Sequence, residues 1–202
     1  MRLRDVLPIM QRRILDHTTY RGIPTLRNPI DYWVYQELLW KIQPDVIVEL
    51  GNRVGGGLVF FSDFCDRMGH GKVIGVDIRN RQLHHRVISE RITTIKGNAV
   101  DSFYKVKAMI NRDDRVMVFE DSSHTFDNTL AVLCLYSKLL QVGDYIIVED
   151  GICNHGLKDG PKPGPYEAIE AFMDGNEDFE IDRTLESFLI TWNPKGYIKR
   201  IR

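Results

Sequence analysis

Two carboxylate-rich segments, residues 119–125 and 148–151, hold the side chains best suited to chemistry. They read F-E-D-S-S-H-T and V-E-D-G, and each follows or ends a run of apolar residues. If the two runs are neighbouring strands, Asp121, Glu149 and Asp150 lie at one edge of a sheet. Clustered carboxylates repel one another unless they are neutralised, and Mg²⁺ is the commonest hard cation that prefers oxygen ligands. The pattern predicts a Mg²⁺ site; the alternative is that each carboxylate separately accepts hydrogen bonds from helix or loop amides.

A histidine, His124, follows Asp121 by three residues. The unperturbed pKa of histidine, about 6.5, suits a general base near neutral pH. Beside a metal site, His124 could take the proton of a substrate hydroxyl, and we predict His124 and Asp121 as the catalytic residues. The alternative is a helix-capping or surface histidine. His155, in the loop after Asp150, is a second candidate, for the substrate entrance.

A glycine-rich turn, E-L-G-N-R-V-G-G-G at residues 49–57, separates an apolar strand from a helix. Glycines let a ligand approach the backbone closely. The spacing fits neither the G-x-G-x-x-G dinucleotide pattern nor a P-loop, which ends in Gly-Lys-Ser/Thr. Glu49 repels a phosphate, so the turn suits a cationic or neutral ligand, such as an amino acid head group with a sulfonium charge. The alternative is a tight turn that binds nothing.

Asp77 ends the next apolar strand of the sequence. A carboxylate at this place can accept hydrogen bonds from both hydroxyls of a ribose, as in nucleoside-binding α/β folds. The alternative is a strand-ending aspartate that caps a helix. A third strand runs into a Gly-Asn turn, and the predicted cofactor residues are Glu49, Gly51, Asn52, Gly55, Asp77, Gly97 and Asn98.

Strands and helices must alternate to bring these residues together. Continuous apolar strands are predicted at residues 45–50, 72–78, 91–99, 115–121 and 144–151, with helices between them. A closing pair of strands within residues 179–201 makes seven. This order favours an α/β fold whose mostly parallel sheet is covered by helices on both faces, and such sheets bind ligands at the carboxyl ends of their strands.

The first 43 residues are helical and aromatic and are predicted to cap the site. An amphipathic helix spans residues 1–20, a Gly/Pro loop covers 20–29, and Asp31 can cap a second helix that stops before Pro44. Residues 44–202 form the body of a single domain, 1–202. Four aromatic residues of this cap suit sugar rings or, alternatively, pack in the core: Tyr20, Tyr32, Trp33 and Tyr35.

Composition limits the classes of function. The 202 residues are 43% hydrophobic and 27% charged, enough for one α/β domain with a core, and a formal charge of −1 argues against a general nucleic-acid binder. No apolar run reaches the roughly 18 residues of a membrane span, and residues 1–16 lack the apolar core of a signal peptide. Three widely spaced cysteines without a CxxC pair favour a reduced, cytoplasmic protein without a zinc site: Cys65, Cys134 and Cys153.

The ordered motifs resemble the cephalosporin hydroxylase family, a branch of the class I S-adenosylmethionine-dependent methyltransferases that also contains rhamnosyl O-methyltransferases. The resemblance covers nearly the whole chain. It rests on these segments: Tyr20-Arg21-Gly22, Pro29-Ile30-Asp31, Tyr35-Gln36, residues 44–57, Asp121-Ser122-Ser123-His124, Gly143, Tyr145, Val148-Glu149-Asp150, Gly164-Pro165, Ala168-Ile169, Phe172, Pro194, Gly196, Tyr197 and Arg200.

The resemblance implies a Rossmann-like class I methyltransferase fold with S-adenosylmethionine and Mg²⁺ as cofactors. The implied S-adenosylmethionine residues are Glu49, Gly51 and Asp77. The implied metal ligands and base are Asp121, Glu149, Asp150 and His124. Three residues depart from the family pattern: Asn52 replaces Thr or Ser, Gly57 replaces Ser, and Glu120 replaces an apolar residue. Glu120 either adds charge near the site or points to the opposite face of the sheet.

The leading hypothesis is an O-methyltransferase that acts on a hydroxyl of a sugar or glycosylated small molecule. Mg²⁺ would lower the pKa of the hydroxyl and fix its position, and alignment with the methyl group supplies much of the rate. A phenol or catechol is the alternative acceptor. An iron hydroxylase would need two histidines and a carboxylate, but no His-x-Asp or His-x-Glu occurs. A non-catalytic nucleoside-binding module is the third hypothesis; no nucleic-acid or membrane partner is expected, and a homo-oligomer is left open.

Overall fold

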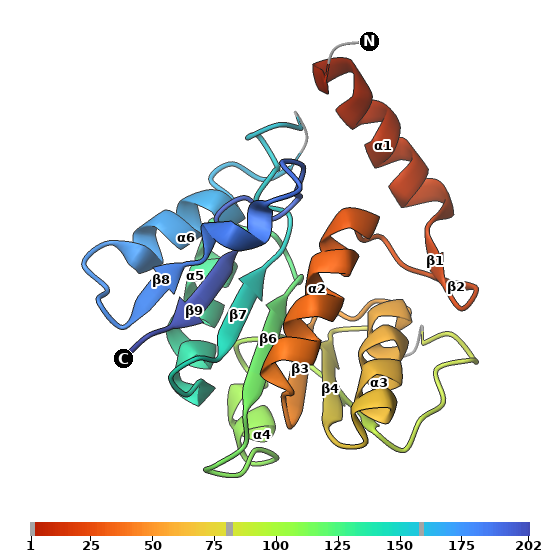
Figure 1. Ribbon diagram of the computed structural model, residues 1–202, viewed down its shortest axis with the longest axis vertical. Helices are drawn as coiled ribbons and strands as arrows, with labels where there is room; N and C mark the ends of the chain where they lie inside the picture. The colour runs from red at the N-terminus through yellow and green to blue at the C-terminus, as the bar shows by residue number, and fades with distance from the viewer. Residues whose placement is uncertain (1–2, 80–82, 158–159) are drawn as a thin grey trace.

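A seven-stranded sheet forms the centre of the computed structural model, which describes residues 3–79, 83–157 and 160–202 (Figure 1). The strands are β3 (Val46–Leu50), β4 (Lys72–Asp77), β5 (Ile92–Lys96), β6 (Val116–Glu120), β7 (Tyr145–Val148), β8 (Phe179–Ile181) and β9 (Tyr197–Arg200). Their order is β5-β4-β3-β6-β7-β9-β8. The first five strands of this order pair in parallel, whereas β9 runs antiparallel to both β7 and β8. The predicted mostly parallel sheet of seven strands is confirmed.

Helices cover both faces of the sheet, as predicted. On one face lie α2 (Pro29–Ile42) and α3 (Gly56–Met68); on the other lie α4 (Phe103–Lys107), α5 (Phe126–Tyr136) and α6 (Pro165–Met173). Each face has its own apolar core, because neighbouring strand residues point in opposite directions. Among the described residues, no helix has both the length and the apolar character that crossing a bilayer requires.

The same alternation decides where the polar residues at the strand ends point. Ile47, Phe119 and Ile147 all belong to the core beneath α2 and α3. Residues two positions further along a strand keep the same face. Three carboxylates therefore point to the α2 and α3 side at the carboxyl edge of the sheet: Glu49, Asp121 and Glu149.

The segment before the sheet contains a hairpin where the sequence analysis expected a plain loop. Helix α1 (Leu3–His17) leads into β1 (Thr19–Tyr20), which pairs antiparallel with β2 (Ile23–Pro24). The two connecting residues, Arg21 and Gly22, have φ angles of 52° and 78°. Positive φ at both positions is the conformation of a tight two-residue hairpin turn, which the Gly/Pro spacing alone did not reveal. The predicted helix 1–20 is confirmed for residues 3–17; residues 1 and 2 lie outside the described part of the chain.

Asn28, and not Asp31 as predicted, caps helix α2. The Asn28 side chain accepts a hydrogen bond from the backbone N–H of Ile30, with Pro29 at the first helical position. Asp31 is instead buried and accepts hydrogen bonds from four donors: Asn28 Nδ2, Thr191 Oγ1, the Trp192 backbone N–H and the Tyr197 hydroxyl. This carboxylate joins the start of α2 to the chain segment that leads into β9.

Candidate active site

A cavity of about 550 Å³ opens at the carboxyl edge of the sheet, within the size range of small-molecule sites. Most of the residues that the sequence analysis assigned to a site line it: Glu49, Gly51, Asn52, Asp77, Gly97, Asn98, Asp121, His124 and Asp150. The segment before the sheet contributes further lining, from Leu15 and from residues 24–27. The predicted cofactor and metal sets thus meet in one cavity.

Gly51 lets the glycine turn pack directly against the end of β6. Its φ is 93°, and a Cβ atom at this position would overlap the backbone carbonyl of Asp121. The backbone N–H of Gly51 donates to the carbonyl of Val76 at 2.8 Å. These contacts require glycine and hold the predicted cofactor turn beside the carboxylates of the metal set.

Gly55 does not line the cavity, which corrects its assignment to the cofactor set. It has a φ of 91°, and a Cβ atom at this position would point toward the side chains of Val87 and Leu83. Gly56 and Gly57 line the cavity in its place. The spacing of the glycines does not show which of them face a ligand, because that depends on the φ and ψ angles of each residue.

Asp77 lines the cavity and also orders its rim. One carboxylate oxygen accepts a hydrogen bond from the backbone N–H of Arg53 at 2.8 Å, and the other accepts from the backbone N–H of Arg79 at 2.6 Å. A carboxylate has about four acceptor sites, so each oxygen keeps capacity for a second donor. Asp77 thus caps two loop segments and not a helix, and the geometry still admits a ribose.

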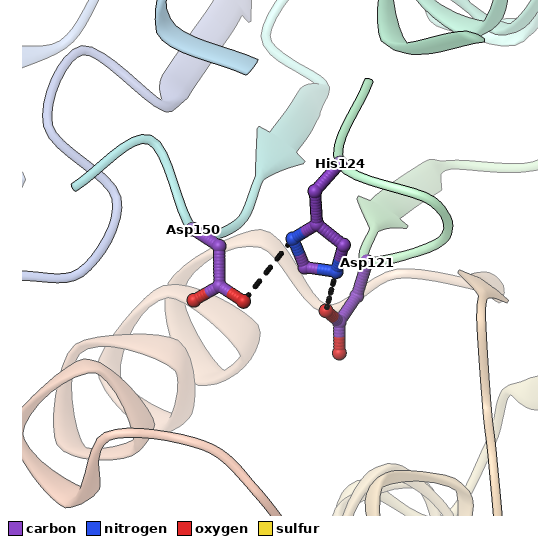
Figure 2. A group of neighbouring side chains, drawn as sticks. All are labelled: Asp121, His124 and Asp150. Atoms are coloured by element: carbon purple, nitrogen blue, oxygen red, sulfur yellow. Dashed lines mark ion pairs between the residues drawn. The ribbon is translucent and has the colours of Figure 1, made fainter. Parts of the chain in front are cut away.

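Asp121, His124 and Asp150 form the group of side chains shown in Figure 2. His124 Nε2 lies 3.4 Å from Asp121 Oδ1, and His124 Nδ1 lies 3.2 Å from Asp150 Oδ2. One ligand atom from each residue lies within 4.8 Å of the others, close enough to share a metal ion. His124 and Asp150 have φ angles of 55° and 58°, a left-handed conformation that costs about 1–3 kcal/mol and concentrates at functional sites.

The carboxylates change the expected protonation of His124. Burial disfavours its charged form, but the hydrogen bond to Asp121 and the charges of Asp150, Asp121 and Glu120 outweigh burial and raise the pKa of His124 to about 10. Burial likewise raises the pKa of Asp150 to about 6, against the opposing charge of His124. The two aspartates therefore favour the protonated imidazole, and the unperturbed pKa near 6.5 does not apply.

Arg27 is the functional residue that the sequence analysis missed. Its side chain is 5% exposed and contacts three carboxylates from three strands. Nη1 lies 2.8 Å from Glu49 Oε1, Nη2 lies 3.1 Å from Asp121 Oδ2, and Nε lies 2.8 Å from Glu149 Oε2. The carboxylates share one face of the sheet and need a buried counter-charge, and that excess of strand-ending acids is the signal that could have found an arginine in the loop before α2.

Burial governs the ionisation of the two glutamates that Arg27 contacts. It raises the pKa of Glu49 to about 7, although Arg27 favours the ionised form. It also raises the pKa of Glu149 well above its usual range, again against Arg27. Among the described residues, Glu49 Oε2 and Glu149 Oε1 are buried without a hydrogen-bond partner. Buried acceptors of this kind can be completed by a water, an ion or a ligand.

The donor set fits a divalent cation. Asp121 and Asp150 present oxygens to the cavity around His124, and Glu149 keeps one buried oxygen free while Arg27 holds the other. Carboxylate oxygens are the ligands that Mg²⁺ prefers. Glu149 itself does not line the cavity, because its side chain is turned to Arg27.

Glu120 points to the opposite face of the sheet from Asp121 and Glu149, which is one of the two alternatives that the sequence left open. It is buried and accepts hydrogen bonds from Ser122 Oγ at 2.6 Å and from Asn128 Nδ2 at 3.2 Å. Burial raises the pKa of Glu120 to about 7, with Ser122 opposing the shift. Glu120 contributes charge behind His124 without lining the cavity.

His155 lies outside the site, contrary to its candidacy for the substrate entrance. His155 Nε2 is 3.0 Å from Glu167 Oε1, and its ring stacks on Tyr166 with 3.8 Å between ring centroids. It is not among the residues that line the cavity.

The four aromatic residues proposed for sugar rings do not line the cavity either. Tyr32 stacks on Phe60 at 4.2 Å, and Tyr35 is 1% exposed within the core beneath α2 and α3. Tyr20 packs edge-on against Phe60, and Trp33 lies on the exposed side of α2. Core packing is therefore the correct reading for the buried rings. Trp192, which the sequence analysis did not single out, is the aromatic side chain that lines the cavity.

Comparisons with known proteins agree with this geometry. The model of the Rhamnosyl O-methyltransferase/CmcI family matches residues 12–201. The chain is 34% identical over 191 residues to a rhamnosyl O-methyltransferase of Mycobacterium bovis, covering 91% of this chain and 78% of the relative. Two solved structures of CmcI resemble the fold over 92% of this chain. They are an apo structure (TM-score 0.72, 26% identity, 76% of that chain) and a structure with Mg-SAM (TM-score 0.71, 27% identity, 77% of that chain).

Proposed function

This chain belongs to the Rhamnosyl O-methyltransferase/CmcI family, and we propose that it is an S-adenosylmethionine-dependent, Mg²⁺-assisted O-methyltransferase that acts on a hydroxyl of a sugar or glycosylated small molecule. The observation that carries the proposal is the meeting of a glycine turn, a ribose-type aspartate and a carboxylate–histidine group in one cavity. Each of these three features is common by itself. Together they match the chemistry of methyl transfer to an activated oxygen.

The cofactor half of the cavity supports binding of S-adenosylmethionine. Gly51 and Asn52 bring backbone to the cavity wall, and Asp77 keeps acceptor capacity on both oxygens. Glu49 is buried with one unpartnered oxygen, which suits the ammonium or sulfonium charge of the cofactor. Gly97 and Asn98 line the cavity beside Asp77, where the nucleoside end would lie. We assign the cofactor site to these six residues.

The carboxylate half supports a Mg²⁺ site held by Asp121, Glu149 and Asp150. Bound Mg²⁺ supplies positive charge that lowers the pKa of an acceptor hydroxyl and offsets the carboxylate charges that raise the pKa of His124. Within the chain, Asp121 and Asp150 fix both nitrogens of the His124 ring. The left-handed backbone at Asp150 turns its carboxylate toward that ring.

His124 is the proposed proton acceptor for the methylated hydroxyl. Its ring lies between the two aspartates and lines the same cavity as the cofactor residues. A general base contributes typically 10²- to 10⁴-fold to a rate. As an imidazolium, His124 can orient an acceptor oxygen by donating to it but cannot take its proton, so base catalysis requires that its pKa falls in the working complex.

The acceptor and location are also proposed. A sugar or glycosylated acceptor follows from the name of the relatives that share a third of their residues with this chain. The same carboxylate and histidine groups could also activate the hydroxyl of a phenol or catechol. The assay below therefore includes catechols as acceptors. The wide spacing of the three cysteines, without a CxxC pair, is consistent with a cytoplasmic location.

A methyl-transfer assay tests the proposal. The purified protein is incubated with S-adenosylmethionine labelled on its methyl group and with a panel of rhamnosides, other sugars and catechols, in Mg²⁺ or in EDTA. We expect Mg²⁺-dependent label on a sugar hydroxyl with one S-adenosylhomocysteine formed per transfer. Label on catechols alone would overturn the acceptor class, and a rate that EDTA does not change would remove the metal.

Matched variants assign the metal dependence to the proposed ligands. Asp150→Asn removes one charge but suits the left-handed backbone, because Asn adopts it readily. It should abolish the Mg²⁺-dependent rate while the protein stays folded. Asp127→Asn is the control, because Asp127 is an exposed aspartate in the first turn of α5. Equal rates for the two variants would make the carboxylate group structural.

A further inference from the structure

Arg27 has a geometry that goes beyond charge compensation. Its guanidinium meets three carboxylates through its three nitrogens: Nε and Nη2 donate hydrogen bonds to Glu149 and Asp121, and Nη1 forms an ion pair with Glu49 without hydrogen-bond geometry. Asp121 gives Oδ2 to Arg27 and keeps Oδ1 toward His124. Glu149 gives Oε2 and keeps Oε1 buried without a partner in the described chain. The fork therefore fixes which oxygen of Asp121 and which oxygen of Glu149 is turned away from Arg27.

The third arm of the fork reaches the other half of the cavity. Nη1 contacts Glu49, which lies on β3 and belongs to the proposed cofactor set. Asp121 and Glu149 follow β6 and β7, the next two strands of the sheet. One side chain thus spans three neighbouring strand ends and joins the cofactor carboxylate to two metal carboxylates.

The surrounding structure is shaped to hold this side chain. Arg27 packs against the rings of Phe61 and Tyr32, with its guanidinium carbon 5.6 Å and 6.0 Å from their centroids. A Cβ atom at Gly57 would overlap both Arg27 Nη1 and Glu49 Oε1. A glycine at the second position of α3 therefore leaves the room that the Arg27–Glu49 contact needs.

We infer that Arg27 is a positioning residue that orients Asp121 and Glu149 for the divalent cation and Glu49 for the cofactor, so that both sites depend on one side chain. The inference rests on the proposed function. It differs from the simpler view that Arg27 is only a counter-ion. A guanidinium fork fixes the direction of each carboxylate, whereas a counter-ion of any shape would only balance charge.

The two views predict opposite changes in metal affinity. If Arg27 only compensates charge, removing it leaves the carboxylates more negative, and a divalent cation binds more tightly. If Arg27 positions the ligands, losing the fork misaligns them, and the cation binds more weakly despite the gain in negative charge. Mn²⁺, titrated by electron paramagnetic resonance, is the probe for the metal site. S-adenosylhomocysteine, titrated by calorimetry, is the probe for the cofactor site.

Three variants and one control separate these outcomes. Arg27→Lys keeps the charge and loses the fork, and Arg27→Gln loses both. Gly57→Ala keeps every charge but pushes the flexible ends of Arg27 and Glu49 apart, so it tests the geometry without leaving a buried carboxylate unpaired. Arg21→Lys is the control, because the Arg21 side chain is 64% exposed and forms its ion pair with Asp63, away from the cavity.

A measurement on the parent protein covers the case in which Arg27 variants do not fold. The Nε–H of Arg27 donates to Glu149 and can be followed by nitrogen-15 resonance in arginine-labelled protein. A positioning residue keeps this hydrogen bond, and slow exchange of the Nε–H with water, when Mg²⁺ is added. If the cation instead displaces Arg27 from the carboxylates, the hydrogen bond is lost and the Nε–H exchanges rapidly with water.

We expect Arg27→Lys and Arg27→Gln to weaken Mn²⁺ and S-adenosylhomocysteine binding together, each by about 10- to 100-fold for the lost charge-assisted hydrogen bonds. Gly57→Ala should weaken Mn²⁺ binding by a smaller factor, and Arg21→Lys should change neither affinity. Mn²⁺ affinity that is unchanged or higher in the Arg27 variants and in Gly57→Ala, or Nε–H protection lost on adding Mg²⁺, overturns the inference. If the parent protein binds neither probe, the proposed function fails instead.

Discussion

Asp144 and Glu149 lie at opposite ends of β7, and both are buried, yet their surroundings differ. Asp144 is 0% exposed and accepts from Arg115 Nε, the Val116 N–H and the Gln141 N–H, so both its oxygens are used. Glu149 is 5% exposed, accepts from Arg27 on one oxygen and keeps the other without a partner among the described residues. One end of the strand is complete without a ligand; the other is not.

The difference shows how one strand serves both stability and function. Polar groups that are fully hydrogen-bonded stabilise a fold, whereas unmet buried groups cost free energy and persist where a ligand completes them. The carboxyl edge also holds the left-handed residues His124 and Asp150 and the raised pKa values of Glu49 and Glu120. Strain and unmet polarity gather at this edge, where sheets of this type bind ligands.

The largest expected effect tests the functional end. His124→Asn keeps a residue that adopts the left-handed backbone but removes the imidazole. We expect turnover to fall by about 10²- to 10⁴-fold while S-adenosylhomocysteine affinity stays nearly unchanged. A rise in KM that exceeds the fall in turnover would indicate that His124 orients the acceptor instead. Both constants within about threefold of the parent would remove His124 from the reaction.

The second prediction concerns pH and the buried glutamates. The pKa of Glu49 and that of Glu120 are each about 7 in the folded chain, above an unfolded value near 4.5. Between these values the folded state binds more protons than the unfolded state, so its stability falls as pH rises from about 4.5 to 7. Urea denaturation in EDTA should show a loss on the order of 3 kcal/mol for each of the two glutamates across this window.

Single variants make the pH prediction specific. Glu120→Gln and Glu49→Gln should each flatten part of the decline, because an amide does not titrate in this range. Asp127→Asn, on the exposed start of α5, should leave the profile unchanged. If the free energy of unfolding of the parent protein does not change with pH in this window, ionising the two buried glutamates costs no stability.

The third prediction compares the two ends of β7 directly. Asp144→Asn should lower the free energy of unfolding by about 1.5–3 kcal/mol, because an amide NH₂ replaces an acceptor for Arg115 or for a backbone N–H. Glu149→Gln should change it by less than about 1 kcal/mol, since Arg27 keeps Glu49 and Asp121 as partners. Urea denaturation measures both, and the reverse order of the two losses would contradict the comparison.

The smallest effect concerns the cofactor. Asp77→Ala should weaken S-adenosylhomocysteine binding by about 1–3 kcal/mol through lost charge-assisted hydrogen bonds. Calorimetry measures the affinity. Asp63→Ala is the matched control, because Asp63 is also a hydrogen-bonded aspartate but lies on α3, away from the cavity lining. Equal affinity for the two variants would leave Asp77 as a loop cap and no more.

Strand ends were predictable from the sequence because apolar runs ending in polar residues mark them. Asp77, Asp121 and Asp150 are examples, and all three line the cavity. The direction of each side chain was less accessible. Glu49 and Glu149 point to a shared face because of the strand period, which could be counted from the sequence, but their common partner Arg27 lies in a loop far away in sequence.

Loop geometry set the other limits. The turn at Arg21 and Gly22 and the orientation of Gly55 depend on positive φ angles that residue types alone do not specify. Asp31 has the residue type of a helix cap. In the structure it is buried and accepts hydrogen bonds from Thr191 and Trp192, near the end of the chain. The pKa of His124 depends on the direction of the neighbouring Asp121 side chain and on Asp150, which only the fold brings near.

A crystal grown with Mn²⁺ and S-adenosylhomocysteine tests the central claim most directly, because anomalous scattering locates the metal without any assumption about activity. The account predicts one peak at the carboxyl edge of β6 and β7, about 2.1 Å from carboxylate oxygens of Asp121, Glu149 and Asp150, with the ribose of S-adenosylhomocysteine on Asp77. Arg27 should still contact Glu49. A peak at other residues, or a nucleoside bound outside the 49–57 turn, would contradict it.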